Sequence, residues 1–287
     1  MSRGRLIIVL GPTAAGKTER SISLALKYGS PVISCDSRQL FKELKIGTAP
    51  PSEEQLAAVQ HYFIRDHSIF DSFTAGKYEA EAVSLIEKLF SEGHETLIMA
   101  GGSCMYIDAV CNGLDDFPEA DAELRATLSR RLKEEGVGAL RLELKRLDPL
   151  TYREIDIANG QRVVRALEVC ILTGKPYSSF KTGRRKERSF DIEKIGLTRP
   201  RAELYRRIDE RAAGMIEAGL VEEARPLIAH RSLPALQTVG YREIFPYIDG
   251  EYSLERALEL IQRNTRHYAR KQLSWWRRDK DIKWEIL

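Results

Sequence analysis

The sequence predicts an α/β fold, a parallel β-sheet flanked by helices, that carries an all-helical insertion. Over the first hundred residues, short apolar runs alternate with amphipathic helical patterns, which is typical of a parallel sheet. From about residue 115 to about residue 191 the chain is charged and helical without a strand pattern, and the strand pattern then returns once. A chain of 287 residues, 43% of them hydrophobic, can bury a core and also hold an insert. We therefore predict a core domain at 1–114 and 192–287 and a helical insertion domain at 115–191.

The core elements are predicted from apolar runs, periodicity and capping residues. A run of four to five apolar residues predicts each buried strand, and a 3.6-residue apolar period predicts each helix. The expected strands are Leu6–Leu10, Pro31–Cys35, Tyr62–Arg65, Thr96–Ala100 and Glu193–Leu197. The expected helices are Lys17–Tyr28, Ser52 to about Gln60, Thr74–Ser91, Arg201–Ala218, Val221–His230 and Ser253 to about Arg278, the last of which closes the chain.

Four helices are predicted in the insertion. Charged residues alternate there with apolar positions at helical spacing, and Gly174 provides a helix stop. The expected helices are Asp121–Glu135, Val137–Leu147, Pro149–Ile155 and Gly160–Thr173.

Positive charge is concentrated in two stretches, although the net charge is only +3. Residues 181–188 hold five basic residues and one acidic residue, and residues 261–287 hold eight basic and three acidic residues. Such stretches fit an anionic polymer as partner, or two solvated helix faces. The four cysteines form no C-x-x-C pair, and no apolar run approaches the length of a membrane span, so we expect a reduced, cytoplasmic protein with no membrane association. Without a coiled-coil signal, a monomer is expected.

A phosphate-binding loop of the P-loop NTPase type follows the first predicted strand. The motif G-x-x-x-x-G-K-T occupies Gly11, Pro12, Thr13, Ala14, Ala15, Gly16, Lys17 and Thr18. Backbone N–H groups of such a loop, the N-terminus of the following helix and Lys17 together favour a diphosphate or triphosphate, and the Thr18 hydroxyl is available to Mg²⁺. The loop identifies a phosphate ligand and leaves the reaction open.

Polar residues follow two further predicted strands. Asp36, Ser37, Arg38 and Gln39 come after the second strand, and Gly101-Gly102-Ser103 comes after the fourth. Because carboxyl ends of parallel strands face the ligand crevice, Asp36 would lie near the loop, as a general base, a metal-associated carboxylate or a helix N-cap. Arg38 and Gln39 suit a base edge or a phosphate.

Six ordered motifs resemble those of the tRNA dimethylallyltransferases, also called tRNA isopentenyltransferases, nearly end to end. They are G-P-T-A-A-G-K-T, C-D-S-R-Q-L-F with I-G-T-A-P, G-G-S-C-M-Y, Q-R-V-V-R-A-L-E from Gln161, Q-T-V-G-Y-R-E from Gln237, and R-K-Q-L-S-W-W from Arg270. The resemblance implies transfer of a dimethylallyl group from dimethylallyl diphosphate to N6 of adenosine 37 beside the tRNA anticodon, with Mg²⁺ and release of diphosphate.

The same resemblance implies roles for individual residues. Thr13 and Thr18 would bind the diphosphate and its metal, Asp36 would act as the base, and Arg211 would lie near the diphosphate. The anticodon stem-loop would be contacted by Asp36 to Gln39 and by the following residues: Ser103, Arg125, Gln161, Arg162, Val163, Val164 and Arg165.

Three other functions compete with this interpretation. A P-loop kinase for a small metabolite would not need the Asp36–Gln39 stretch or the basic C-terminal helix. An isopentenyltransferase for free adenylate would not need the helical insertion. The third is a non-catalytic RNA-binding protein that keeps a nucleotide switch.

Overall fold

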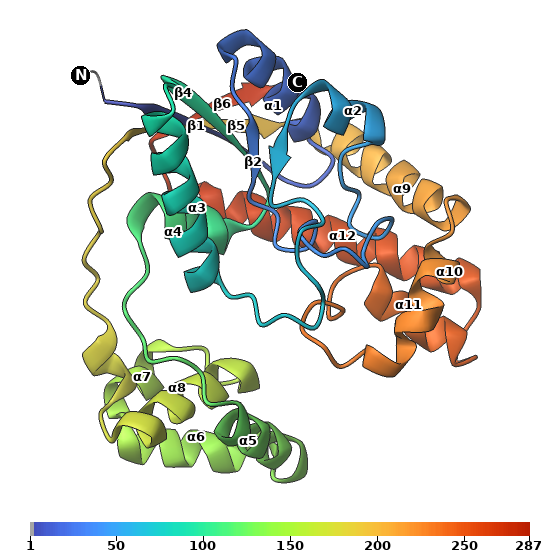
Figure 1. Ribbon diagram of the computed structural model, residues 1–287. Coiled ribbons are helices and arrows are strands. Elements are labelled where there is room, and N and C mark those ends of the chain that lie inside the picture. The colour runs from blue at the N-terminus through green and yellow to red at the C-terminus, as the bar shows by residue number, and fades with distance from the viewer. Residues whose placement is uncertain (1–2) are drawn as a thin grey trace. The chain divides into compact units, whose positions relative to one another are not determined.

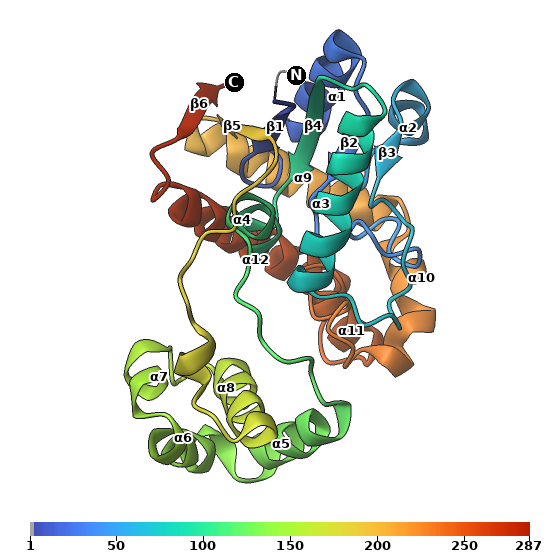
Figure 2. The ribbon, with the colours of Figure 1, turned by 60° about the vertical axis from the view of Figure 1, so that its left-hand side comes forward.

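The computed structural model describes residues 3–287, which form two compact units. The core unit comprises the chain up to Asn112 together with Glu187–Leu287, and the small unit comprises Gly113–Lys186. Figures 1 and 2 show both. No helix within 3–287 is long and apolar enough to cross a membrane.

A six-stranded parallel sheet forms the centre of the core unit, so the predicted α/β class is confirmed. Its strand order is β3-β2-β4-β1-β5-β6, and every pairing is parallel. The strands are β1 Arg5–Leu10, β2 Val32–Ser34, β3 His61–Tyr62, β4 Thr96–Gly101, β5 Asp191–Thr198 and β6 Ile282–Ile286.

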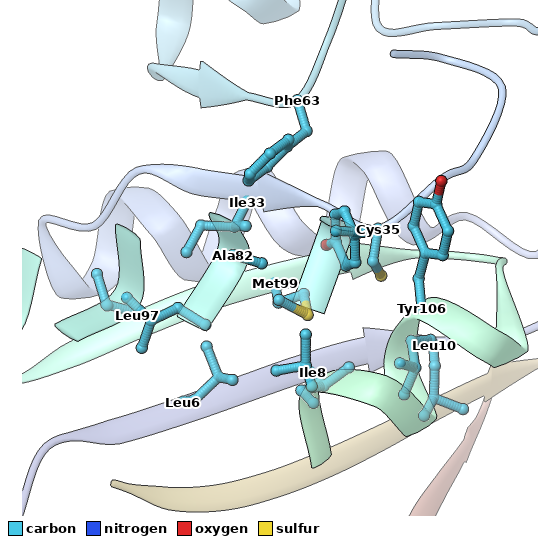
Figure 3. Packing of buried hydrophobic residues seen from close by; sticks show 14 of the residues in the cluster. Leu6, Ile8, Leu10, Ile33, Cys35, Phe63, Ala82, Leu97, Met99 and Tyr106 are labelled. Atoms are coloured by element: carbon cyan, nitrogen blue, oxygen red, sulfur yellow. The ribbon is translucent and has the colours of Figure 1, made fainter. Parts of the chain in front are cut away.

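Alternate residues of the strands pack into different layers, as the period of two in a strand requires. Leu6, Ile8 and Leu10 of β1 pack with Leu97 and Met99 of β4 in one buried cluster, which Figure 3 shows. The intervening side chains of β1 and β4 belong to a second cluster with helix α1. Both layers are almost fully buried, which explains why these strands read as continuous apolar runs.

Within residues 3–287, the core unit has eight α-helices around the sheet and next to it. They are α1 Lys17–Tyr28, α2 Glu53–Ala58, α3 Ala75–Ser91, α4 Cys104–Asn112, α9 Arg201–Glu217, α10 Leu220–Ala224, α11 Tyr241–Ile248 and α12 Leu254–Trp276. Helix α3 and helix α4 pack on the β1 Leu6 side of the sheet. Helix α12, together with α9, packs against Ala14 of the phosphate loop.

Several predicted elements were wrong in detail. The chain does not close on a helix, because α12 is followed by the edge strand β6. Strand β3 stops at Tyr62 because Phe63 and Arg65 adopt left-handed φ values of 60° and 53°. The helix expected at Val221–His230 becomes a 3₁₀ helix from Arg225, since the proline after it lacks an N–H donor. Helices α4 and α11 were not predicted.

The small unit is a helical bundle with its own core. Its helices are α5 Ala122–Glu134, α6 Gly136–Leu147, α7 Pro149–Glu154 and α8 Gly160–Thr173, followed by a 3₁₀ turn, Tyr177–Phe180. Leu128, Leu140, Leu144 and Leu167 from three of these helices form a fully buried cluster. The four helices begin and end close to the predicted positions, and three of them, α5, α7 and α8, have a side-chain N-cap from Asp121, Asp148 and Asn159.

Candidate active site

One cleft of the core unit collects the ends of three neighbouring strands. The loops after β1, β2 and β4 line a cavity of about 730 Å³, and α9 and α12 complete its wall. Ligands of open parallel sheets bind at this carboxyl edge. The cleft therefore contains the predicted phosphate loop, the Asp36–Gln39 stretch and Ser103 together.

The phosphate loop has the backbone conformation that its glycines permit. Gly11 and Gly16 have φ values of 150° and 105°, and a Cβ on Gly11 would stand 2.3 Å from the Leu197 carbonyl oxygen. Ala14 also has a positive φ, 64°. Two arginines that follow β5 hold the loop from outside it: Arg199 Nε donates to the Ala15 carbonyl (3.1 Å) and Arg207 Nε donates to the Ala14 carbonyl (2.9 Å).

Lys17 reaches back over the loop. Its Nζ donates to the carbonyl oxygens of Gly11 (2.9 Å) and Pro12 (2.8 Å). Burial of the amine lowers the pKa of Lys17 to about 8, Asp36 opposes this shift, and Arg211 adds to it. The charged form of the Lys17 amine is therefore only slightly favoured near neutral pH. A bound diphosphate would supply an anion that favours the charged form.

The affinity of this loop for a diphosphate ligand is expected to fall as the pH rises above about 8. The amine loses its charge above the pKa of the free site, so the KM for the diphosphate should rise by up to about tenfold per pH unit until the raised pKa of the complex is reached. Steady-state kinetics from pH 6.5 to 10 measure this. Lys17→Arg keeps its charge and should show no such rise; an equal rise in that variant would mean that another group titrates.

One carboxylate oxygen of Asp36 accepts hydrogen bonds from its own loop, and the other accepts none within residues 3–287. Oδ1 accepts from the backbone N–H groups of Arg38 (2.9 Å) and Gln39 (3.4 Å), which makes a local turn cap. Within residues 3–287, Oδ2 accepts no hydrogen bond. No helix of the described chain begins directly after Asp36, so the helix N-cap expected as one alternative is instead a turn cap, and the second carboxylate oxygen lies in the cleft.

The residues next to Asp36 are hydrogen-bonded to other segments of the core unit. Ser103 Oγ accepts from the Ser37 N–H (2.8 Å) and donates to Ser37 Oγ (3.0 Å), which links the loops after β2 and β4. Arg38 donates to the Pro234 carbonyl (2.9 Å). Gln39 Nε2 donates to the carbonyls of Thr48 and Ala49. These side chains shape the cleft wall in this structure.

Arg211 and Thr18 are two polar groups beside the loop that make no side-chain hydrogen bond within residues 3–287. Arg211 lines the cleft and makes no hydrogen bond or ion pair with any residue of 3–287. Protein atoms desolvate the guanidinium and lower its pKa, with Glu19 opposing and Arg207 reinforcing the shift, yet its water-exposed side chain stays charged. The Thr18 hydroxyl likewise has no hydrogen bond among the described residues. A lone hydroxyl suits Mg²⁺, which takes most of its ligands from phosphate and water.

The predicted RNA contacts of the small unit separate into exposed and buried residues. Gln161 and Arg162 are exposed, whereas Val163 and Val164 belong to the buried core of the bundle. Arg125 and Arg165 share the fully buried carboxylate of Glu168, at 2.5 and 2.8 Å, and remain partly exposed. The valine side chains are thus placed where RNA does not reach them.

The sequence did not assign functions to two residues that shape this cleft. Gln272 of α12 contacts the phosphate loop. Glu223 of α10 accepts from the backbone N–H groups of Lys45, Ile46 and Gly47 and so fixes the loop that holds Gln39. Gln272 lies in the motif R-K-Q-L-S-W-W, and Ile46 and Gly47, which donate to Glu223, lie in I-G-T-A-P. The motifs identify these positions in the sequence, but only the structure shows which residues they contact.

A phosphate loop lies in one cleft of a parallel sheet with an arginine and a carboxylate oxygen that have no partner within residues 3–287, which fits an enzyme that transfers a group from a phosphate-bearing donor. The family model described as IPP transferase matches residues 39–279. The chain belongs to this family, and its activity is that of a tRNA dimethylallyltransferase, a prenyltransferase. The resemblance seen in the sequence is confirmed.

Relatives match over nearly the whole chain. The chain is 50% identical over 284 residues to tRNA dimethylallyltransferase 1 of Bacteroides fragilis, which covers 99% of this chain and 94% of the relative. A tRNA isopentenylpyrophosphate transferase of Bacillus halodurans is 33% identical with a TM-score of 0.71, covering 99% of this chain and 90% of that one. A eukaryotic dimethylallyltransferase acting on tRNA has a TM-score of 0.82 at 24% identity over 99% of this chain and 74% of its own, which shows the shared fold.

Proposed function

We propose that the cleft of the core unit binds dimethylallyl diphosphate on the phosphate loop and prenylates N6 of adenosine 37 of tRNA, with Asp36 as base and Arg211 beside the leaving group. The observation that carries this proposal is the position of a free Asp36 oxygen in the same cleft as Lys17 and an unpaired Arg211. Lys17 and Arg211 would stabilise the departing anion, and Asp36 would take the proton that the acceptor loses.

The donor half of the reaction uses the loop and two cations. As the C1–O bond of dimethylallyl diphosphate breaks, negative charge grows on the diphosphate. Lys17, the backbone N–H groups at the start of α1 and Arg211 would stabilise that charge from the wall of the same cleft. Thr18 would hold Mg²⁺, which when bound neutralises part of the diphosphate charge. Thr13, on the same loop, would hold the donor in place.

The acceptor half uses the loop after β2. The exocyclic amine of adenine is a weak nucleophile, because its lone pair is delocalised into the ring. As the C–N bond forms, a proton passes from N6 to Asp36 Oδ2, which has no other partner among residues 3–287. Ser37, Arg38, Gln39 and Ser103 would position the adenosine, since their hydrogen bonds fix the wall next to Asp36.

Each unit presents hydrogen-bond donors, most of them basic, that would bind RNA phosphates. On α12, Arg263, Arg270 and Lys271 are exposed, and in the small unit Arg125, Gln161, Arg162 and Arg165 offer donors. We exclude Val163 and Val164 from this set because they are buried. We also propose that the enzyme is a monomer and that it acts in the cytoplasm, where its tRNA substrate is found.

Nucleoside mass spectrometry tests this function. Unmodified tRNA is incubated with the protein, Mg²⁺ and dimethylallyl diphosphate, and a parallel reaction offers AMP and ATP. We expect a C5H8 gain on one adenosine of the anticodon loop and no prenylated AMP. Prenylated AMP would instead identify a free-adenylate enzyme, and phosphate transfer from ATP without prenylation would identify a kinase.

A further inference from the structure

Gln272 is a buried amide between the two substrate-binding loops. It lies on α12, one residue after the exposed Lys271, and is only 2% exposed. Its Oε1 accepts from the backbone N–H of Thr13 (2.9 Å), and its Nε2 donates to the carbonyl of Gly102 (2.8 Å). One side chain therefore joins the phosphate loop after β1 to the glycine turn after β4.

The residues around Gln272 leave room for its amide and allow both hydrogen bonds. A Cβ on Gly102 would stand 2.5 Å from Gln272 Nε2, so the glycine makes room for the amide. Tyr268, one turn earlier on α12, approaches the same Gly102 carbonyl at 3.5 Å. A buried amide that makes both hydrogen bonds costs little to bury, whereas an apolar side chain of similar size would leave two backbone groups without partners.

We propose that Gln272 is a positioning residue for diphosphate binding. It holds the first half of the phosphate loop, through the Thr13 N–H, in register with the turn that carries Ser103 and with the helix that presents the exposed basic residues. A loop held in its binding conformation does not have to be ordered when the ligand arrives, so its affinity is higher. The inference rests on the proposed function only in taking a diphosphate as the ligand of the loop.

Pyrophosphate binding separates positioning from catalysis. The dissociation constant of pyrophosphate with Mg²⁺ is measured by calorimetry on the full chain for the native protein, Gln272→Met and Gln262→Met. Methionine preserves the side-chain volume without either hydrogen bond, and Gln262, on the same helix, makes one long hydrogen bond of 3.4 Å to Asp209 away from the cleft. We expect the constant to rise about tenfold in Gln272→Met, as the loss of one to two hydrogen bonds implies, and to stay within about twofold in Gln262→Met.

Hydrogen exchange provides a second readout that does not depend on ligand binding. The peptide around Thr13 should exchange faster in Gln272→Met, while the melting temperature and the exchange of α3 stay close to native. If the methionine variant does not fold, Gln272→Asn, which is one methylene shorter and reaches at most one of the two partners, is expected to show the same rise and faster exchange.

The inference is overturned if the folded variant binds pyrophosphate as the native protein does, or if exchange around Thr13 is unchanged. Both results leave the proposed function standing. Failure of the native protein itself to bind pyrophosphate would instead overturn the proposed function, and this inference with it.

Discussion

Asp36→Asn is expected to lower kcat for tRNA prenylation by about a hundredfold or more, with tRNA affinity within about twofold of native. The amide keeps an oxygen that can accept from the N–H groups of Arg38 and Gln39, so the loop conformation survives. It cannot take the proton that N6 must lose. Single-turnover rates at saturating dimethylallyl diphosphate measure the first quantity, and filter binding of labelled tRNA measures the second.

Asp66→Asn is the control for this change. It makes the same substitution at a carboxylate that is 44% exposed and paired with His67, outside the set of residues that lines the cleft. Its turnover should match the native value. A turnover of Asp36→Asn within tenfold of native would show that another group, or water, takes the proton. A parallel loss of tRNA affinity would make Asp36 a binding group instead.

The parts of the fold that the sequence predicted are those with strong local signals. Strand β1 is a continuous apolar run, and α1 begins directly after the glycines of the loop, so both were located closely. Strand β6 was missed because its five residues, I-K-W-E-I, include two charged ones and form a strand only beside β5 at the sheet edge. Helix α11 was missed because Pro246 lies inside eight residues of helix, where it removes a donor.

The same contrast holds for the site. The loop Gly11–Thr18 is contiguous, so a single motif predicts it. The bridge from Gln272 to Thr13 spans 259 positions, and no local pattern could reveal it. On α8, helical periodicity alone would have separated Val163 and Val164, which are buried, from Gln161 and Arg162, which are exposed. The prediction assigned RNA contact to every residue of the motif from Gln161 to Arg165 and did not separate its buried residues from its exposed ones.

Arg211→Gln is expected to lower kcat by about a hundredfold with little change in the KM for tRNA. The Arg199 and Arg207 side chains donate to carbonyl oxygens of the phosphate loop, whereas Arg211 makes no hydrogen bond or ion pair within residues 3–287. Arg211 is near enough to Lys17 to affect its pKa. We expect the guanidinium to donate hydrogen bonds to the departing diphosphate, on which negative charge grows during the proposed reaction. Rates at saturating substrates measure the loss.

Arg206→Gln and Arg211→Lys make this prediction specific. Arg206 is on the same helix, pairs with Glu210 on the surface, and should tolerate the change. Lysine at 211 keeps the charge without the planar fork, so it should recover part of the rate, to within about tenfold of native. If Arg211→Gln weakened tRNA binding as much as it slowed turnover, Arg211 would be a phosphate contact for RNA. The leaving group would then be stabilised by Lys17 and the loop amides without it, and the unpaired guanidinium would mark the RNA path.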